Sequence, residues 1–117
     1  MRTVVLDANA LLMPFELNIN LDLELQRLIG DHRTVVPGPI VGELKRCGAR
    51  QSGAALALAR KYDIIPVSSS GDDAVIDLAR ELHAYVVTND KELRSRLRKE
   101  GIPLIYLRSG HHLVLED

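Results

Sequence analysis

Short runs of apolar residues, separated by polar and turn-forming segments, recur along the whole chain. Each run is rich in β-branched residues and lacks the alternation of polar and apolar positions that marks a half-exposed strand. Such runs are typical of strands that are buried on both faces of a parallel sheet. They predict strands at residues 4–6, 35–36, 64–65, 85–87 and 104–107.

Between these runs, apolar residues recur with the spacing of α-helices. One stripe has the spacing i, i+4, i+7 and i+8, and a glycine ends it. It consists of Leu21, Leu25, Leu28 and Ile29, followed by Gly30. Similar patterns predict further helices at residues 39–44, 54–62, 71–82 and around 93–97. Strands that alternate with helices imply crossover connections, so we expect an α/β fold with a mostly parallel sheet and helices on both faces.

The composition is that of a soluble globular protein, because 46% of the 117 residues are apolar and 26% are charged. This length predicts one domain over residues 1–117, since two independent cores need a longer chain. No apolar run approaches the roughly 20 residues that cross a bilayer, so we expect no membrane contact. The single cysteine, Cys47, excludes an internal disulfide and fits a reducing, cytoplasmic location.

Charge is distributed unevenly. The net charge of −1 argues against a broadly basic surface, but residues 91–108 carry six Lys or Arg against two Asp or Glu, a net charge of +4. Basic residues at helical spacing in this segment suit contacts with the phosphates of a nucleic acid, and a solvated helix face explains them equally well. The candidates for nucleic-acid binding are Lys91, Arg94 and Arg98 here, and Lys45 and Arg46, followed by Arg50, in a second patch.

Acidic residues follow the predicted strands at the edge where parallel sheets bind ligands. In such sheets, ligands lie outside the carboxyl ends of the strands, near the point where the strand order reverses. Asp7 directly follows the first strand, and Asp90 closely follows the fourth. Glu43 lies on the helix after the second strand, and Asp72 and Asp73 open the fourth helical segment. Four separate segments thus each bring an acid to this edge.

Carboxylates that gather at one edge repel each other, and a bound cation is the usual way to stabilise them. Oxygen ligands without clustered Cys or His indicate Mg²⁺ or Mn²⁺ rather than zinc. Such ions activate water and neutralise charge on a phosphate, so the acids suit hydrolysis of a phosphodiester. Each acid also has a simpler interpretation on its own, because Asp7, Asp72 and Asp90 suit helix N-caps and Glu43 suits an exposed helix position.

Three segments of the sequence resemble the motifs of the PIN domain family of metal-dependent nucleases. Residues 4–9, with the sequence VVLDAN, are similar to the family's opening strand, which ends in Asp-x-(Thr/Ser/Asn). The proline after the second strand and the helix that bears Glu43 resemble the second motif, and Thr88 and Asp90 occupy the places of the (Ser/Thr)-x-Asp motif. The resemblance covers essentially the whole chain, and it is greatest for short archaeal members, which in turn resemble the nuclease of eukaryotic small-subunit rRNA processing.

The resemblance implies roles for the acids. Asp7, Glu43, Asp72 and Asp90 would be the catalytic residues and would hold one or two ions of Mg²⁺ or Mn²⁺. The third acid follows the family pattern Asp-x-x-(Ile/Val)-x-x-x-Ala, which Asp72 satisfies and Asp73 does not. Asp73 is then either an additional acid of the metal site or a residue that acts on the metal ligands from behind them.

The resemblance also implies a fold and a function. The expected fold is a three-layer α/β/α sandwich around a central, mostly parallel sheet of about five strands. The expected activity is that of an endoribonuclease on single-stranded or structured RNA, as the toxin of a toxin–antitoxin pair or as an RNA-processing nuclease. Its partners would be RNA, an antitoxin or a processing protein, and a second copy in a homodimer. Asn9 and Thr88 would orient the carboxylates by hydrogen bonding, although Thr88 equally suits a simple strand end.

Two other functions are compatible with the sequence. A PIN-fold module that binds RNA or protein without turnover would have the same scaffold. The absence of one of the four acids would favour such a module, but all four are present. A phosphatase or phosphotransfer domain of the haloacid dehalogenase type would use Asp7 as a nucleophile. That family needs a second aspartate two residues later, where this chain has Asn9.

Overall fold

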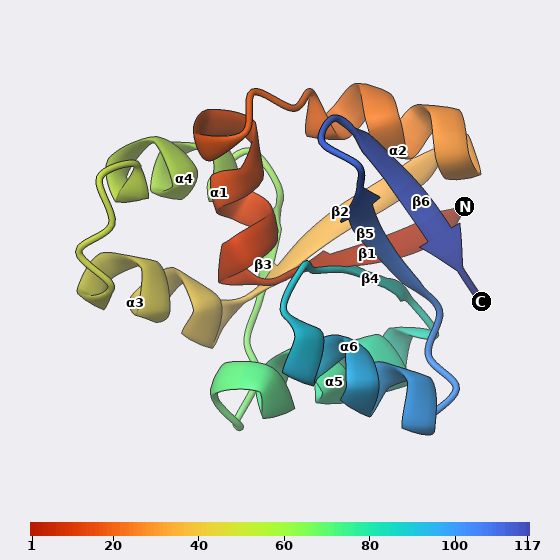
Figure 1. Cartoon of the computed structure of the whole chain (residues 1–117). Coiled ribbons are helices and arrows are strands. Elements are labelled where there is room, and N and C mark those ends of the chain that lie inside the picture. The colour runs from red at the N-terminus through yellow and green to blue at the C-terminus, as the bar shows by residue number, and fades with distance from the viewer.

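A single six-stranded sheet forms the centre of the molecule in the computed structural model, which describes residues 1–117 (Figure 1). The strand order is β3-β2-β1-β4-β5-β6, and every pair is parallel except β5 with β6. The predicted α/β fold with a mostly parallel sheet is therefore confirmed. The strands are β1 (Arg2–Leu6), β2 (His32–Pro37), β3 (Asp63–Ile65), β4 (Tyr85–Val87), β5 (Leu104–Arg108) and β6 (His112–Glu116).

Helices cover both faces of this sheet. In Figure 1, α1 and α2 lie above the sheet, whereas α5 and α6 lie below it. None of the helices is both long and apolar enough to cross a bilayer, and the longest, α5, has 12 residues. The helices are α1 (Ala8–Glu16), α2 (Leu21–Ile29), α3 (Gly38–Arg46), α4 (Ser52–Ala59), α5 (Gly71–Leu82) and α6 (Lys91–Lys99).

The core forms because the central strands are apolar on both faces. Val4 and Val5 of β1 and Val86 and Val87 of β4 have no exposed surface. Helices complete the core with apolar stripes, such as Val75, Leu78 and Ala79 on one side of α5, all at most 1% exposed. This burial is the main favourable contribution to folding, and it holds β1 and β4 side by side at the centre.

One helix was not predicted from the sequence. Helix α1 begins at the first strand's end, where Asp7 is its N-cap, and it includes Pro14. A proline inside a helix removes a backbone donor and costs about 3 kcal/mol, which argues against a helix when the sequence is read alone. In the structure, Ala10, Leu11 and Met13 are buried in the core, and their burial offsets that cost.

The predicted helix at residues 54–62 was too long at its carboxyl end. Helix α4 ends at Ala59, and the backbone N–H groups of Lys61 and Tyr62 bond back three residues rather than four. This tighter turn leads into β3, which starts at Asp63. The Tyr62 hydroxyl donates a hydrogen bond of 2.6 Å to the Asp22 carboxylate on α2, so a tertiary contact is made where the sequence pattern is helical.

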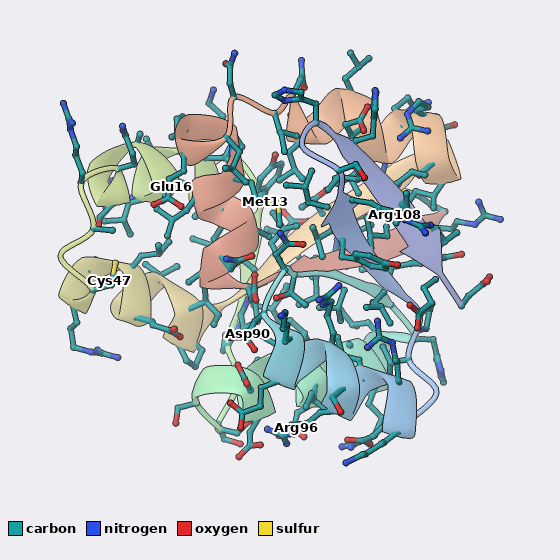
Figure 2. All side chains as sticks on the ribbon, viewed as in Figure 1. Met13, Glu16, Cys47, Asp90, Arg96 and Arg108 are labelled. Atoms are coloured by element: carbon teal, nitrogen blue, oxygen red, sulfur yellow. The ribbon has the colours of Figure 1, made fainter.

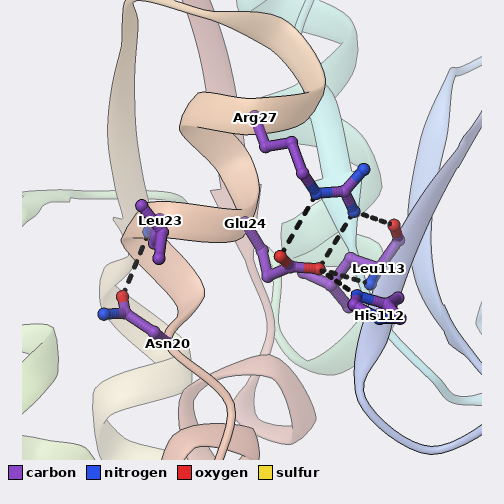
Figure 3. A network of polar contacts seen from close by, with 6 residues as sticks. All are labelled: Asn20, Leu23, Glu24, Arg27, His112 and Leu113. Carbon is purple, nitrogen blue, oxygen red and sulfur yellow. Dashed lines mark hydrogen bonds and ion pairs between the residues drawn. The ribbon is translucent and has the colours of Figure 1, made fainter.

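The carboxyl-terminal segment adds a sixth strand to the five that the sequence predicts. Strand β6 pairs antiparallel with β5 and is fastened to α2 by the network in Figure 3. Glu24 Oε1 accepts a 2.9 Å hydrogen bond from the Leu113 N–H, and Arg27 Nη2 donates to the Leu113 carbonyl over 2.8 Å. Glu24 and Arg27 also form an ion pair at 3.0 Å. The segment therefore folds back on its own chain, an outcome that the sequence left open.

Candidate active site

The strand order reverses between β1 and β4. The chain runs from β1 to β2 and β3 on one side of β1, and then returns through α5 to β4 and β5 on the other side. Ligands of open parallel sheets bind at such a reversal, outside the carboxyl ends of the strands. Asp7 follows β1 at this point, and Thr88, Asn89 and Asp90 follow β4. Asp90 is labelled at the start of α6 in Figure 2.

Asp7 is the buried acid of this edge, with 6% of its surface exposed. Its Oδ1 accepts a 2.7 Å hydrogen bond from the Ala10 N–H, as the N-cap of α1, and its Oδ2 accepts one from the Thr88 hydroxyl. The pKa of Asp7 is raised from its ordinary value of 3.8 to about 7, chiefly by burial. The two hydrogen bonds lower this pKa, and the charges of Asp72 and Asp90 raise it. The structure thus concentrates negative charge around a carboxylate that is poorly solvated.

Thr88 connects the ends of the two central strands. Its side chain has no exposed surface, and its hydroxyl donates to Asp7 and accepts a 3.1 Å hydrogen bond from the Asp90 N–H. The Asp90 carboxylate is exposed and caps α6, because its Oδ1 accepts from the Leu93 N–H over 2.9 Å. The other oxygen of Asp90 makes no hydrogen bond. Thr88 therefore fixes the backbone of one acid relative to the side chain of another.

Asn9 and Asn89 form a second connection across the same edge. The Asn9 Oδ1 accepts a 2.8 Å hydrogen bond from the Asn89 N–H. Asn9 therefore holds the loop after β4 and forms no hydrogen bond with a carboxylate. Asn89 was not predicted from the sequence, and its Oδ1 accepts from the Leu107 N–H of β5 over 2.9 Å. The signal was its position at a strand end, where Asn side chains often bond to the backbone.

The helix acids are held less firmly. Asp72 lies in the first turn of α5 and makes no hydrogen bond or ion pair; its partial burial, followed by the charge of Asp90, raises its pKa. Glu43 is exposed on α3 and likewise has no polar partner. The structure therefore brings Asp7, Asp72 and Asp90 within electrostatic range of one another, while Glu43 is not among the principal charges that act on Asp7 or Asp72.

Asp73 faces a cation instead. Its Oδ1 lies 2.7 Å from Arg96 Nη2 of α6, in a pair whose two side chains are both largely exposed. Asp73 has the smallest effect of the charges that raise the pKa of Asp72, and it is not among those that act on Asp7. Of the two adjacent acids, Asp72 is therefore the one whose charge interacts with Asp7 and Asp90.

Two of the predicted nucleic-acid contacts on α6 have partners within the protein. The Arg94 guanidinium packs over the Tyr106 ring at 4.7 Å from its centroid. Arg98 forms a two-pronged ion pair with Glu116, with Nε–Oε2 and Nη2–Oε1 distances of 2.6 Å and 3.1 Å. The other three candidates are exposed and have no ion pair; they are Lys91, Lys45 and Arg46.

The chemistry of the acids fits a hard divalent cation. Their donors are all carboxylate oxygens, and their mutual repulsion is the kind that such a cation relieves. No three acidic, histidine or cysteine side chains converge closely enough here to form a ready-made cage. Asp7 and Asp90 each use one carboxylate oxygen to cap a helix. Asp72 and Glu43 form no hydrogen bond, so their side chains are free to rotate toward Asp7 and Asp90.

Comparisons with known proteins agree with this geometry. A family model described as "PIN like domain" matches residues 4–110. Ribonuclease VapC4 of Methanocaldococcus jannaschii is 32% identical over 127 residues, which cover 98% of this chain and 97% of that protein. Ribonuclease VapC9 of Archaeoglobus fulgidus is 26% identical over 122 residues, which cover 98% and 90% of the two chains.

Solved structures show the same fold. The structure of the PIN domain endonuclease Utp24 superposes with a TM-score of 0.84 at 24% identity and covers 97% of this chain and 90% of that chain. A domain of a functionally unknown protein from Methanocaldococcus jannaschii has a TM-score of 0.64 at 16% identity over 93% of each chain. At these identities the likeness concerns the fold alone.

Proposed function

This chain belongs to the PIN-like domain family, and we propose that it is a metal-dependent endoribonuclease whose single nuclease domain spans residues 1–117. The observation that carries the proposal is the arrangement at the strand reversal, where Asp7 and Asp90 are joined through Thr88 and Asp72 adds its charge. Two relatives that match nearly the whole chain are both named ribonucleases, which supports RNA as the substrate class.

In this proposal, Asp7, Glu43, Asp72 and Asp90 hold Mg²⁺ or Mn²⁺, and Asp73 adds negative charge at the rim. A divalent ion bound by carboxylates supplies an activated water and neutralises charge that develops on a phosphate. The buried Asp7 is the anchor, because its two hydrogen bonds fix the direction of both oxygens. Glu43 and Asp72 complete the set by rotation of side chains that have no other partner.

Thr88 and Asn9 are positioning residues in this scheme. Thr88 orients the Asp7 carboxylate and, through its own lone pair, the backbone of Asp90. Asn9 acts at one remove, since it binds the N–H of Asn89 and so sets the path of the loop that delivers Asp90. Partners of this kind typically account for 10–100-fold in metal affinity or activity.

The relatives named above and the resemblance of the sequence motifs also suggest a cellular role. The protein would act in the cytoplasm on single-stranded or structured RNA, either as the toxin of a toxin–antitoxin pair or in RNA processing. Its partners would be an antitoxin or a processing protein, and a second copy in a homodimer. Light scattering of the purified protein tests the dimer, because a mass near 13 kDa would contradict it.

Cleavage of labelled RNA and single-stranded DNA, with Mg²⁺, with Mn²⁺ and with EDTA, tests the activity. We expect RNA to be cut only with a divalent metal, and Asp7→Asn to abolish the cutting. Asp31→Asn is the matched control, because it removes an exposed carboxylate at the amino end of β2, the opposite edge of the sheet. Tight RNA binding without cutting in either metal would instead favour a module that binds RNA without turnover.

A further inference from the structure

Two segments of the chain carry the same net positive charge, but they differ in how many of their basic residues form ion pairs within the protein. Residues 91–108, which include α6 and β5, carry six Lys or Arg against two acids, and residues 38–62, which include α3 and α4, carry five against one. Both segments therefore have a net charge of +4. Phosphates respond to charges that are exposed and unpaired, so the ion pairs of each segment decide which one attracts a nucleic acid.

The arginines of α6 are bound to other parts of the protein. Arg96 pairs with Asp73 at 2.7 Å, and Arg98 pairs with Glu116 through its Nε and Nη2. The Arg94 guanidinium packs over a tyrosine ring of β5, and its Nε is buried without a partner. Most of the positive charge that the sequence places on this helix is thus neutralised or covered.

The basic residues of the α3–α4 arm, which we define as residues 38–62, are free. Lys45, Arg46 and Arg50 are exposed, and none of them forms an ion pair. The only acid of the arm is Glu43, one of the residues proposed to hold the metal. No other segment of the chain combines this much net positive charge with so little internal pairing.

The arm starts at the acidic edge, which we define as the edge of the sheet that carries Asp7, Asp72 and Asp90. Helix α3 begins directly after β2, the strand beside β1, and it contacts α1 and α5, whose amino ends carry Asp7 and Asp72. Figure 1 shows α3 and α4 at the side of the molecule where β2 ends, and Cys47, directly after Arg46, marks the outer end of α3 in Figure 2. A rise of 1.5 Å per residue places Lys45 about 10 Å along α3 from its start.

From these observations we infer that the substrate strand passes over the α3–α4 arm, where Lys45, Arg46 and Arg50 bind the phosphates of a single-stranded RNA next to the acids. The inference rests on the proposed function and adds the face by which RNA is held. Aromatic residues are 3% of the chain, so stacking of bases contributes little and the grip is electrostatic. Binding by the arm is therefore tolerant of sequence and sensitive to salt.

The test measures binding without cleavage. The anisotropy of a fluorescein-labelled, 20-nucleotide single-stranded RNA is titrated with protein in EDTA, between 50 and 200 mM KCl, and the same is done with single-stranded DNA and duplex RNA. The arm variant carries Lys45→Gln, Arg46→Gln and Arg50→Gln. The control variant carries Arg80→Gln, Arg98→Gln and Lys99→Gln, which change the net charge equally on the α5–α6 surface.

We expect the arm variant to bind the RNA at least about tenfold more weakly at 100 mM KCl. The slope of log K against log salt should fall by about 2, because three contacts to a single strand contribute about 0.7 each. The control variant should stay within about threefold of the wild type. Circular dichroism of both variants verifies that the fold is retained, and charge reversal at Arg50 alone (Arg50→Glu) provides a milder variant if the triple variant is unfolded.

The remaining outcomes overturn the inference. Equal losses in both variants would show that only net charge matters, and a larger loss in the control would place the RNA on α6. Preference for duplex RNA, or absence of binding by the wild type, would exclude a single-stranded track on the arm. Failure of the proposed function looks different: RNA bound through the arm in EDTA, but not cut with Mg²⁺ or Mn²⁺.

Discussion

The acidic edge has a strand side and a helix side, and they are held by different forces. On the strand side, Asp7 and Asp90 cap helices and are linked through the buried hydroxyl of Thr88. On the helix side, Glu43 and Asp72 project from α3 and α5 and form no hydrogen bond. Backbone geometry positions the first pair, whereas only helix packing positions the second.

This difference separates stability from function. A strand-side change alters helix caps and a buried charge, so it affects the folded state as well as the site. A helix-side change removes a carboxylate that forms no hydrogen bond or ion pair in the fold. The four predictions below test that division, starting with the largest effect.

Removal of a helix-side acid should abolish activity without a loss of stability. We expect Asp72→Asn and Glu43→Gln each to lower cleavage by on the order of 100–1,000-fold, the usual cost of losing a group that stabilises transition-state charge. The free energy of unfolding in EDTA should fall by less than about 0.5 kcal/mol, because neither side chain makes a hydrogen bond or an ion pair that the substitution would break. Single-turnover cleavage and urea unfolding measure the two effects, and a large loss of stability would contradict the division.

Protonation of Asp7 should make the metal-free protein more stable at lower pH. Its folded-state pKa of about 7 exceeds the ordinary value of 3.8, so the folded state binds the proton more tightly and stability falls as pH rises between these values. Above pH 7 Asp7 is ionised in both states, and the stabilisation from its protonation is lost. Between pH 5 and 8 the free energy of unfolding should therefore fall by about 3 kcal/mol.

Urea unfolding in EDTA across pH 5–8 measures this slope, and Asp7→Asn is its control. Asparagine is also a good N-cap, so the variant keeps the bond to Ala10 without the buried charge. We expect the stability of Asp7→Asn to depend less on pH than that of the wild type. At pH 8 the variant should be more stable than the wild type, but inactive. A wild-type stability that rises from pH 5 to 8 would refute the burial argument.

Thr88→Val tests the link between the two strand-side acids. Valine keeps the shape of the side chain but removes the donor to Asp7 and the acceptor for the Asp90 N–H. Isothermal titration with Mn²⁺ should show a 10–100-fold weaker affinity, and unfolding should become about 1–2 kcal/mol easier. Thr88→Ser, which retains the hydroxyl, should restore most of both, whereas a simple strand-end role predicts no change in affinity.

Asp73→Asn should have the smallest effect. Its ion pair with Arg96 is largely exposed, and such pairs contribute less than about 1 kcal/mol. We expect cleavage within about threefold of the wild type. If Asp73→Asn were as damaging as Asp72→Asn in the same assay, the two residues would share the role that the family pattern assigns to Asp72.

Much of the fold, and the position of the candidate site in it, could be predicted from local pattern. All five predicted strands are present, and the helix that opens at Gly71 ends at Leu82 as its apolar stripe predicts. Helix α1 was missed because Pro14 is unfavourable in a helix and only burial against the core overrides it. The assignment of Asp7, Glu43, Asp72 and Asp90 to a metal remains a prediction, since their convergence depends on side-chain rotation.

The sequence by itself determined that Asp7 and Asp90 lie at the ligand edge, because residues that follow a buried parallel strand emerge at its carboxyl end. Only the tertiary structure decided how those acids and the basic residues are paired. Thr88 contacts Asp7 across 81 positions of the chain, and Arg98 finds Glu116 only because β6 folds back. Hydrogen bonds and ion pairs act over a few ångströms, so they depend on distances in space that no spacing along the chain encodes.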